Sequence, residues 1–184
     1  MEQLPPLSLY VHIPWCVRKC PYCDFNSHRV RGELDAEGYI DALLVDLSYD
    51  LKRVGYRPLQ SIFIGGGTPS LFAPSAIARL LDGVKKLVAW NEPLEITLEA
   101  NPDDLSPSFV RDLKNSPVNR FSIGIQSFHD EDLVYLNRVH DSNQGQQSLK
   151  IARDAGYTNL TVDLIYGIPG LTEEKWKNNL ETFF

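Results

Sequence analysis

The three cysteines of the chain, Cys16, Cys20 and Cys23, lie within a stretch of eight residues, and the 184-residue sequence contains no other. Their spacing, with three and then two intervening residues, allows three thiolates on one loop to converge on a single small object. Closed iron-sulfur and zinc sites use four ligands, so this set is one ligand short. A 4Fe-4S cluster bound by three cysteines leaves one iron open to a reacting molecule. The spacing therefore predicts an iron-sulfur cluster with one vacant coordination position.

Other sites are compatible with these cysteines taken alone. A Cys3His zinc site could use His12 or His28 as its fourth ligand. Cys20 and Cys23 also form a C-x-x-C pair of the glutaredoxin type, in which one thiol has a lowered pKa. The presence of a third cysteine, Cys16, and the barrel-like organisation of the chain disfavour a glutaredoxin-type dithiol. Buried structural cysteines are disfavoured because the surrounding loop is polar.

A second candidate ligand-binding segment is the triple glycine at residues 65–67. Glycines let the backbone approach a ligand closely because they have no Cβ atom, although a tight turn between a strand and a helix has the same requirement. Three polar residues, Glu99, Gln126 and Asp163, lie in or at the ends of otherwise apolar strands. Because a buried polar group needs a partner, these positions are candidates for a binding pocket.

Hydrophobic periodicity predicts the strands and helices that must position these groups. Short runs rich in β-branched and aromatic residues indicate strands, and apolar residues that recur every three to four positions indicate helices. The expected strands are residues 7–13, 61–64, 94–100, 120–126 and 159–165. The expected helices are residues 35–52, 74 to about 88, 106–115, one or two helices within 130–154, and a last helix that begins at 172.

Five successive strand-helix units with short loops require parallel strands joined by right-handed crossovers. Both an open doubly wound sheet and a barrel meet that requirement. Nearly all the unusual residues fall at or just after the C-terminal ends of strands, where β/α barrels build their active sites, so the sequence favours a barrel. Five strands do not close a parallel barrel, and the sequence stops inside a helix. We therefore expect an incomplete barrel that belongs to a longer protein.

Composition restricts the classes of partner and compartment. The formal net charge is −6 and the sequence pI is about 5.2, with no conspicuous cluster of Lys or Arg, which argues against nucleic-acid binding. The N-terminus lacks the features of a signal peptide, and no apolar run approaches the roughly 20 residues of a membrane span. We expect a cytoplasmic protein, in which clustered thiols are kept reduced for metal or redox chemistry.

Six motifs occur in order along nearly the whole chain. They are YVHIPWC at 10–16, CPYCDF at 20–25, IGGGTPS at 64–70, EANP at 99–102, IGIQSF at 123–128 and DLIYGIP at 163–169. Together they resemble the radical S-adenosylmethionine (SAM) superfamily, and within it the HemN/HemW group of oxygen-independent coproporphyrinogen III oxidases and their haem-chaperone relatives. The resemblance implies an α/β fold, a partial (β/α)6 TIM-like barrel with about five parallel βα units. Residues 1–184 would then be an incomplete core domain that lacks the sixth unit and a C-terminal domain.

The resemblance also implies two cofactors, a 4Fe-4S cluster bound by the three cysteines and SAM. In that superfamily an electron passes to the SAM sulfonium and a 5′-deoxyadenosyl radical forms, while the protein supplies orientation and excludes water and oxygen. By this resemblance the residues near the cluster and SAM are Tyr10 and Tyr22, those at the methionine end of SAM are Gly66, Gly67 and Thr68, and those that line the SAM pocket are Glu99, Gln126, Arg138 and Asp163. For Arg138 the alternative is an ordinary exposed helix arginine.

Two features favour the haem chaperones over the oxidases within this group. The oxidase pattern has an extra cysteine two residues after the third ligand, where this chain has Phe25, and it has a long N-terminal extension, whereas the first strand here begins at Leu7. We therefore expect a protein that binds a cluster and SAM and transfers haem to an acceptor protein, with a flavodoxin-type protein as reductant. The alternatives are a coproporphyrinogen III oxidase, which acts on a porphyrinogen, and a zinc-stabilised interaction domain.

Overall fold

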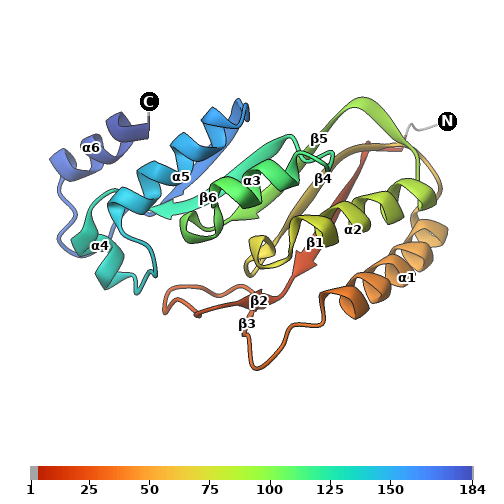
Figure 1. Ribbon diagram of the computed structural model, residues 1–184, viewed down its shortest axis with the longest axis horizontal. Helices are drawn as coiled ribbons and strands as arrows, with labels where there is room; N and C mark the ends of the chain where they lie inside the picture. Colours follow the sequence, from red (N-terminus) through yellow and green to blue (C-terminus); the bar gives the residue numbers. More distant parts are fainter. Residues whose placement is uncertain (1–3, 184) are drawn as a thin grey trace.

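A computed structural model describes residues 4–183, which form a parallel sheet covered on one face by helices (Figure 1). The strands of this sheet are β1 (Leu7–Ile13), β4 (Leu59–Gly66), β5 (Trp90–Ala100), β6 (Arg120–Gln126) and β7 (Asn159–Leu164). The helices are α1 (Ala36–Val54), α2 (Pro74–Leu87), α3 (Pro107–Leu113), α4 (Asp130–Tyr135), α5 (Ser142–Asp154) and α6 (Glu173–Phe183), with short 3-10 turns η1 (Pro69–Leu71) and η2 (Pro102–Asp104).

The five strands lie in sequential order, β1-β4-β5-β6-β7, and every neighbouring pair is parallel. In a doubly wound sheet the strand order reverses and helices cover both faces. A sequential order with right-handed crossovers instead places each connecting helix on the same face, and Figure 1 shows the helices on one side of the strands. The expected partial β/α barrel with about five parallel units is confirmed.

The two faces of the sheet differ in polarity because successive side chains of a strand point to opposite sides. On β6, Phe121 and Ile123 are fully buried in the core beneath the helices. Arg120, on the face without helices, donates hydrogen bonds to Glu95 and Thr97 of β5 at 3.2 and 3.1 Å. The core therefore lies between sheet and helices, and the inner face of the partial barrel is polar.

Local sequence signals explain where the main helices begin and which side they bury. The Asp35 side chain caps α1 by accepting a hydrogen bond from the Gly38 amide at 2.9 Å. Pro74 opens α2 at a position where its missing N–H costs nothing. The buried residues of α2 recur at helical spacing and pack on the sheet; they are Ala76, Ile77, Leu80, Leu81 and Val84.

The predicted elements all occur, with shifts of a few residues at their ends. β4 and β5 extend beyond the predicted 61–64 and 94–100, and the segment 130–154 contains two helices. Sequence patterns missed two short strands, β2 (Trp15–Cys16) and β3 (His28–Arg29), which pair in parallel inside the cysteine loop. Two-residue strands show no periodicity that could reveal them. Over residues 4–183, no helix has the length and apolar character needed to cross a bilayer.

Candidate functional site

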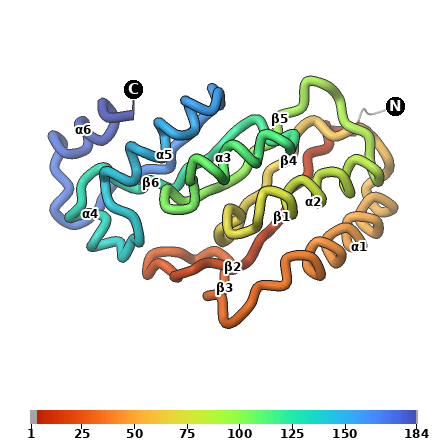
Figure 2. Tube along the Cα trace, in the orientation of Figure 1, coloured from red at the N-terminus to blue at the C-terminus, as the bar shows by residue number. Residues whose placement is uncertain are grey.

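The cysteine loop leaves the C-terminal end of β1 and folds back on itself. Figure 2 shows this segment in red to orange at one end of the sheet. Cys16 lies opposite Arg29 in the β2-β3 pair, and its carbonyl accepts the Val30 amide at 2.9 Å. The Cys23 amide donates to the Cys20 carbonyl at 3.2 Å, which closes a turn between those two thiols. All three thiols are free and half-buried.

Aromatic packing fixes the base of this loop. The Trp15 ring, which directly precedes Cys16, meets Tyr39 of α1 edge-on at 4.5 Å between ring centroids and stacks on Phe72 at 6.1 Å, with 28° between the ring planes. The Tyr39 hydroxyl donates to the His12 carbonyl at 2.9 Å. The loop is therefore attached to both α1 and the segment after β4.

The triple glycine ends β4 and lies against the same loop. The Gly67 amide donates to the Ile13 carbonyl at 2.7 Å, and a Cβ atom at Gly67 would come within 2.5 Å of the Trp15 carbonyl oxygen. Gly66 has a φ of 116°, which side chains rarely adopt, and its amide donates to Glu99 at 3.0 Å. Close packing of protein on protein therefore already requires two of these glycines, and their contact with a ligand stays a prediction.

The three polar strand residues lie on adjacent strands, Glu99 on β5, Gln126 on β6 and Asp163 on β7. Burial raises the pKa of the Glu99 carboxyl, and the charge of Asp163 raises it further, although the Gly66 amide opposes the shift. Burial likewise raises the pKa of Asp163. Gln126 has a φ of 69°, a left-handed conformation that is uncommon for a residue with a side chain. The site therefore holds two partly desolvated carboxyl groups beside a strained residue.

Arg138 lies between α4 and α5 and is half-buried, so it is not an exposed helix arginine. One of its terminal nitrogens lies 3.5 Å from the Cys20 sulfur and 3.4 Å from the Tyr22 hydroxyl. The other donates to Asn101 at 2.7 Å and to the Gly124 carbonyl at 2.9 Å. Arg138 thus connects the cysteine loop to β6. Burial is the main reason that the pKa of Tyr22 is raised to about 12.

All the predicted site residues except Tyr10 line one cavity at the C-terminal ends of the strands. Its volume, about 120 Å³, is smaller than the roughly 300–1,000 Å³ typical of small-molecule sites. A ligand held here would therefore extend onto the open polar face of the sheet. The predicted residues in this cavity are Cys16, Cys20, Cys23, Tyr22, Gly66, Gly67, Thr68, Glu99, Gln126, Arg138 and Asp163.

Tyr10 lies outside this cavity on β1, and 56% of it is exposed. Its hydroxyl lies 2.8 Å from His12 Nδ1, and His12 Nε2 lies 2.7 Å from the carbonyl of Asn26 in the cysteine loop. A carbonyl only accepts, so Nε2 holds the proton and Nδ1 accepts from Tyr10. Tyr10 is thus connected to the cysteine loop through His12, and its predicted place beside the cofactors stays a prediction.

Sequence reasoning missed Asn101 as a residue of the cavity. Its side-chain nitrogen donates to the Thr68 hydroxyl at 3.1 Å and its oxygen accepts from Arg138, so it links the glycine loop to the arginine. Its position directly after a strand, two residues beyond Glu99, was the available signal. Ser122 and Gly124 of β6 also line the cavity, but nothing in the sequence distinguishes them from ordinary strand residues.

The donor set fits an iron-sulfur cluster because the cysteine loop contributes three half-buried thiols to the lining of the cavity. Within residues 4–183, no group of three or more His, Cys, Asp or Glu side chains is arranged to hold a single metal ion. The pocket also has unused hydrogen-bonding capacity, since Arg138 Nε is buried and has no partner among the described residues. A free buried donor in a cavity that also contains the carboxyl groups of Glu99 and Asp163 suits a polar ligand that both accepts and donates hydrogen bonds.

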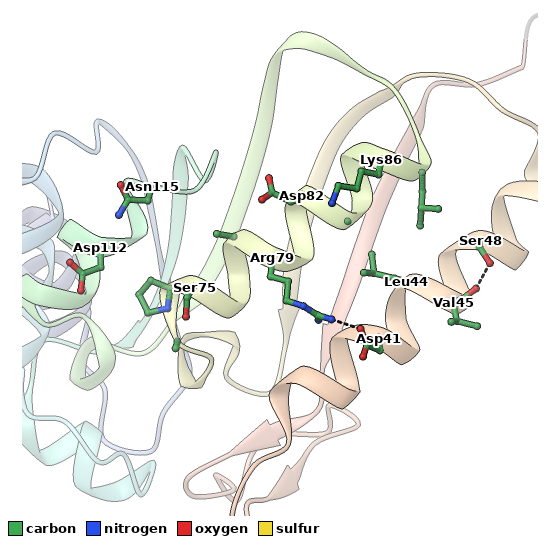
Figure 3. Close-up of a pocket in the computed structure, with 15 residues that line it drawn as sticks. Asp41, Leu44, Val45, Ser48, Ser75, Arg79, Asp82, Lys86, Asp112 and Asn115 are labelled. Carbon is green, nitrogen blue, oxygen red and sulfur yellow. Dashed lines mark hydrogen bonds and ion pairs between the residues drawn. The ribbon is translucent and has the colours of Figure 1, made fainter.

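A larger hollow lies elsewhere, on the outer surface between α1, α2 and α3 (Figure 3). It measures about 1210 Å³ and its lining includes Leu44, Val45 and Lys86. Figure 3 shows Arg79 of α2 directed at Asp41 of α1, with which it forms an ion pair. None of the predicted site residues lines this hollow, so the groups capable of chemistry are concentrated in the smaller cavity.

Comparison with known families identifies the superfamily. The sequence matches the radical SAM superfamily over residues 10–183. The chain is a radical SAM protein. Radical SAM proteins with solved structures include the coproporphyrinogen III oxidase HemN of Escherichia coli, which is 32% identical to this chain and superposes with a TM-score of 0.85 over 97% of it and 41% of HemN.

Curated relatives of this radical SAM chain include proteins named as haem chaperones. The haem chaperone HemW of Haemophilus influenzae is 45% identical over 98% of this chain and 48% of its own length. HemW of Escherichia coli is also 45% identical, over 95% of this chain and 46% of its own length. The chain therefore spans about half the length of the curated relatives that it matches, and the expected resemblance to the HemN/HemW group is confirmed.

Proposed function

We propose that this radical SAM chain binds a 4Fe-4S cluster and SAM in the cavity at the strand ends and acts, as the core domain of a HemW-like protein, in the delivery of haem to an acceptor protein. One observation supports this above the others. Three thiols, a glycine loop and the polar ends of three strands, which are far apart in the sequence, line a single cavity. Amino-acid composition alone does not require these groups to lie together.

Each group would have a separate task in cofactor binding. Cys16, Cys20 and Cys23 would hold the cluster, which when bound supplies the electron that cleaves SAM. Arg138 would draw the cysteine loop against β6, and its free Nε–H would be available to an acceptor such as a carboxylate. Glu99 and Asp163, which have no basic side chain directly bonded to them among the described residues, would suit the cationic and hydroxyl groups of SAM.

The haem-chaperone function is favoured over the oxidase for two reasons. The position of the extra oxidase cysteine is occupied by Phe25, which is 63% exposed in the cysteine loop and provides no thiol. The identity to proteins named HemW reaches 45%, against 32% for HemN. Haem, a protein acceptor and a flavodoxin-type reductant are accordingly the partners we propose, in a cytoplasmic setting.

Cofactor binding is tested by anaerobic reconstitution with iron and sulfide. The protein should gain a visible iron-sulfur absorption that bleaches on reduction with dithionite and an EPR signal that changes when SAM is added. The Cys23→Ser variant should not gain that absorption. The control variant Asn26→Ser, which changes a residue of the same loop that is not a cysteine, should gain it. A colourless protein that retains one zinc ion per chain would contradict the proposal and support the zinc-stabilised interaction domain.

The choice between chaperone and oxidase is tested with the full-length protein that contains this chain. The proposal expects haem binding and transfer to an apo-haemoprotein, and no CO2 from coproporphyrinogen III under anaerobic reducing conditions with SAM. HemN serves as the positive control for CO2 release. Release of CO2 by this protein at a rate like that of HemN would establish the oxidase instead.

A further inference from the structure

The geometry points to Asn179 of α6 as a positioning residue for the SAM pocket, one that holds the end of β6 in the backbone conformation from which Gln126 lines the cavity. This inference rests on the proposed function, because the ligand that Gln126 would meet is the SAM of that proposal. Asn179 itself is fully buried and does not line the cavity. Its effect must therefore pass through the backbone of β6.

Gln126 is the residue that needs support. Its φ of 69° lies in the left-handed region, and the β6-β7 register is irregular between Ile123 and Gln126. A residue with a side chain persists in that region only when its surroundings determine the conformation strongly. The next peptide turns sharply, since the Ser127 amide donates back to the Ile125 carbonyl at 2.9 Å. The contacts on each side of this turn decide where the Gln126 side chain points.

Asn179 supplies the contact on the far side of the turn. Its Oδ1 accepts the Phe128 amide at 2.6 Å in a buried setting. Its other neighbour, the Ser127 hydroxyl, is 3.3 Å away and lies closer to Asp132, at 2.8 Å. A hydroxyl has one proton, which the shorter bond to Asp132 takes. The Phe128 amide is therefore the main donor to Asn179, and without Asn179 it would be left unpaired in the interior.

Contacts from other elements hold the near side. His140, buried between α4 and α5, donates from Nε2 to the Ile125 carbonyl at 3.1 Å. The Ile165 amide donates to the Gln126 carbonyl at 2.9 Å. The left-handed residue is thus fixed on both sides, and Asn179 is the support that comes from the last helix.

The hydrogen bonding of Asn179 shows which half of its amide is used. Its Nδ2 is buried and has no partner among residues 4–183. A buried amide that leaves two donors unpaired is costly, so the packing of α6 alone would favour an apolar residue at this position. The acceptor Oδ1, which meets the Phe128 amide, gives a reason for an asparagine here.

The test compares Asn179→Leu, which keeps the branched shape of the side chain and removes the acceptor, with Asn178→Leu at the exposed neighbouring position of the same helix. In the 184-residue chain, hydrogen exchange of a peptide covering residues 124–128 should be faster in Asn179→Leu than in wild type or Asn178→Leu. After reconstitution, Asn179→Leu should bind SAM roughly tenfold more weakly with an unchanged iron-sulfur absorption. A purely structural role would lower cluster content and SAM affinity together.

A double-mutant cycle separates the effect of Asn179 on the Gln126 backbone from a general loss of stability. Glycine adopts the left-handed region freely, so Asn179→Leu should lower the melting temperature less in a Gln126→Gly background than in wild type. Equal losses in both backgrounds, or wild-type SAM affinity in Asn179→Leu, would overturn the inference. If Asn179→Leu does not fold, Asn179→Ser replaces it in the same comparisons.

The two proposals fail in different ways. If the wild-type chain gains a cluster and binds SAM but Asn179→Leu matches it in affinity and exchange, only the positioning role is wrong. If the wild-type chain binds no SAM, the proposed function and this inference are both overturned.

Discussion

Asp104 is the last residue of η2, and the pKa of its carboxyl group is raised to about 6, mainly by burial. The Ser70 hydroxyl donates to it at 2.6 Å and opposes the shift. Because the folded protein holds the proton more tightly than the unfolded chain, whose ordinary value is 3.8, ionisation of Asp104 destabilises the fold. The stability is therefore lost as pH rises from about 4 to about 6, by at most about 3 kcal/mol for this one group.

Asp104→Asn removes this ionisation and keeps an oxygen that can accept from Ser70. We expect the variant to be more stable than wild type at pH 8 and about equal to it near pH 4, because only the ionised aspartate is penalised by burial. Thermal unfolding at the two pH values measures the difference. Asp103→Asn, at the exposed neighbouring position, is the control, and a destabilised Asp104→Asn at pH 8 would show that the carboxylate is favoured by its surroundings.

At the scale of elements, the contact between the end of β4 and the cysteine loop determines the shape of the site. A Cβ atom at Gly67 would lie 2.5 Å from the Trp15 carbonyl oxygen and 2.9 Å from the Trp15 nitrogen. Both are backbone atoms, so they cannot rotate away. The glycine loop and the cysteine loop can therefore lie this close only while residue 67 lacks a side chain.

Gly67→Ala should separate these two segments. We expect a loss of about 1–3 kcal/mol in the free energy of unfolding, as for other overpacked positions, together with less iron-sulfur absorption after reconstitution. Denaturant unfolding and the visible spectrum measure the two effects. In α5, Gly145→Ala is the matched control, because its nearest neighbour is an Ile125 side-chain atom at 3.5 Å. Wild-type values for Gly67→Ala in both measurements would refute the expectation.

At the scale of the whole molecule, stability should decrease from the centre of the sheet to its ends. β5 pairs with both β4 and β6, and Ile96 and Leu98 are almost completely buried. Among the residues that the structure describes, β7 pairs only with β6, and none of its residues is fully buried. Local opening requires less free energy where fewer buried contacts are broken.

Amide hydrogen exchange tests this gradient. The amides of Ile96 and Leu98 should be among the slowest to exchange, and those of β7 should exchange faster by an order of magnitude or more, in proportion to the smaller free energy of local opening. Exchange followed by NMR or mass spectrometry gives the comparison within one sample. Slower exchange in β7 than in β5 would mean that contacts outside residues 4–183 or within the polar inner face protect that edge.

Sequence patterns were sufficient to predict the order of elements and the chemical groups available to the site. Strand and helix periods are local properties, and residues that end parallel strands must meet at one edge, so Glu99, Gln126 and Asp163 could be placed together from the pattern alone. The three thiols lie close to one another in the sequence, and so do the three glycines of residues 65–67. Proximity along the chain was enough to group them.

The way in which these groups are held depends on contacts between distant parts of the chain. Arg138 lies 118 residues after Cys20 and reaches it from the connection between α4 and α5, and Asn179 supports the turn after Gln126 from the last helix. Tyr10, by contrast, is not among the residues that line the cavity, although its motif adjoins the cysteines. Side-chain direction depends on packing between elements that are distant in sequence. Hydrophobic periodicity is a local property and does not predict that packing.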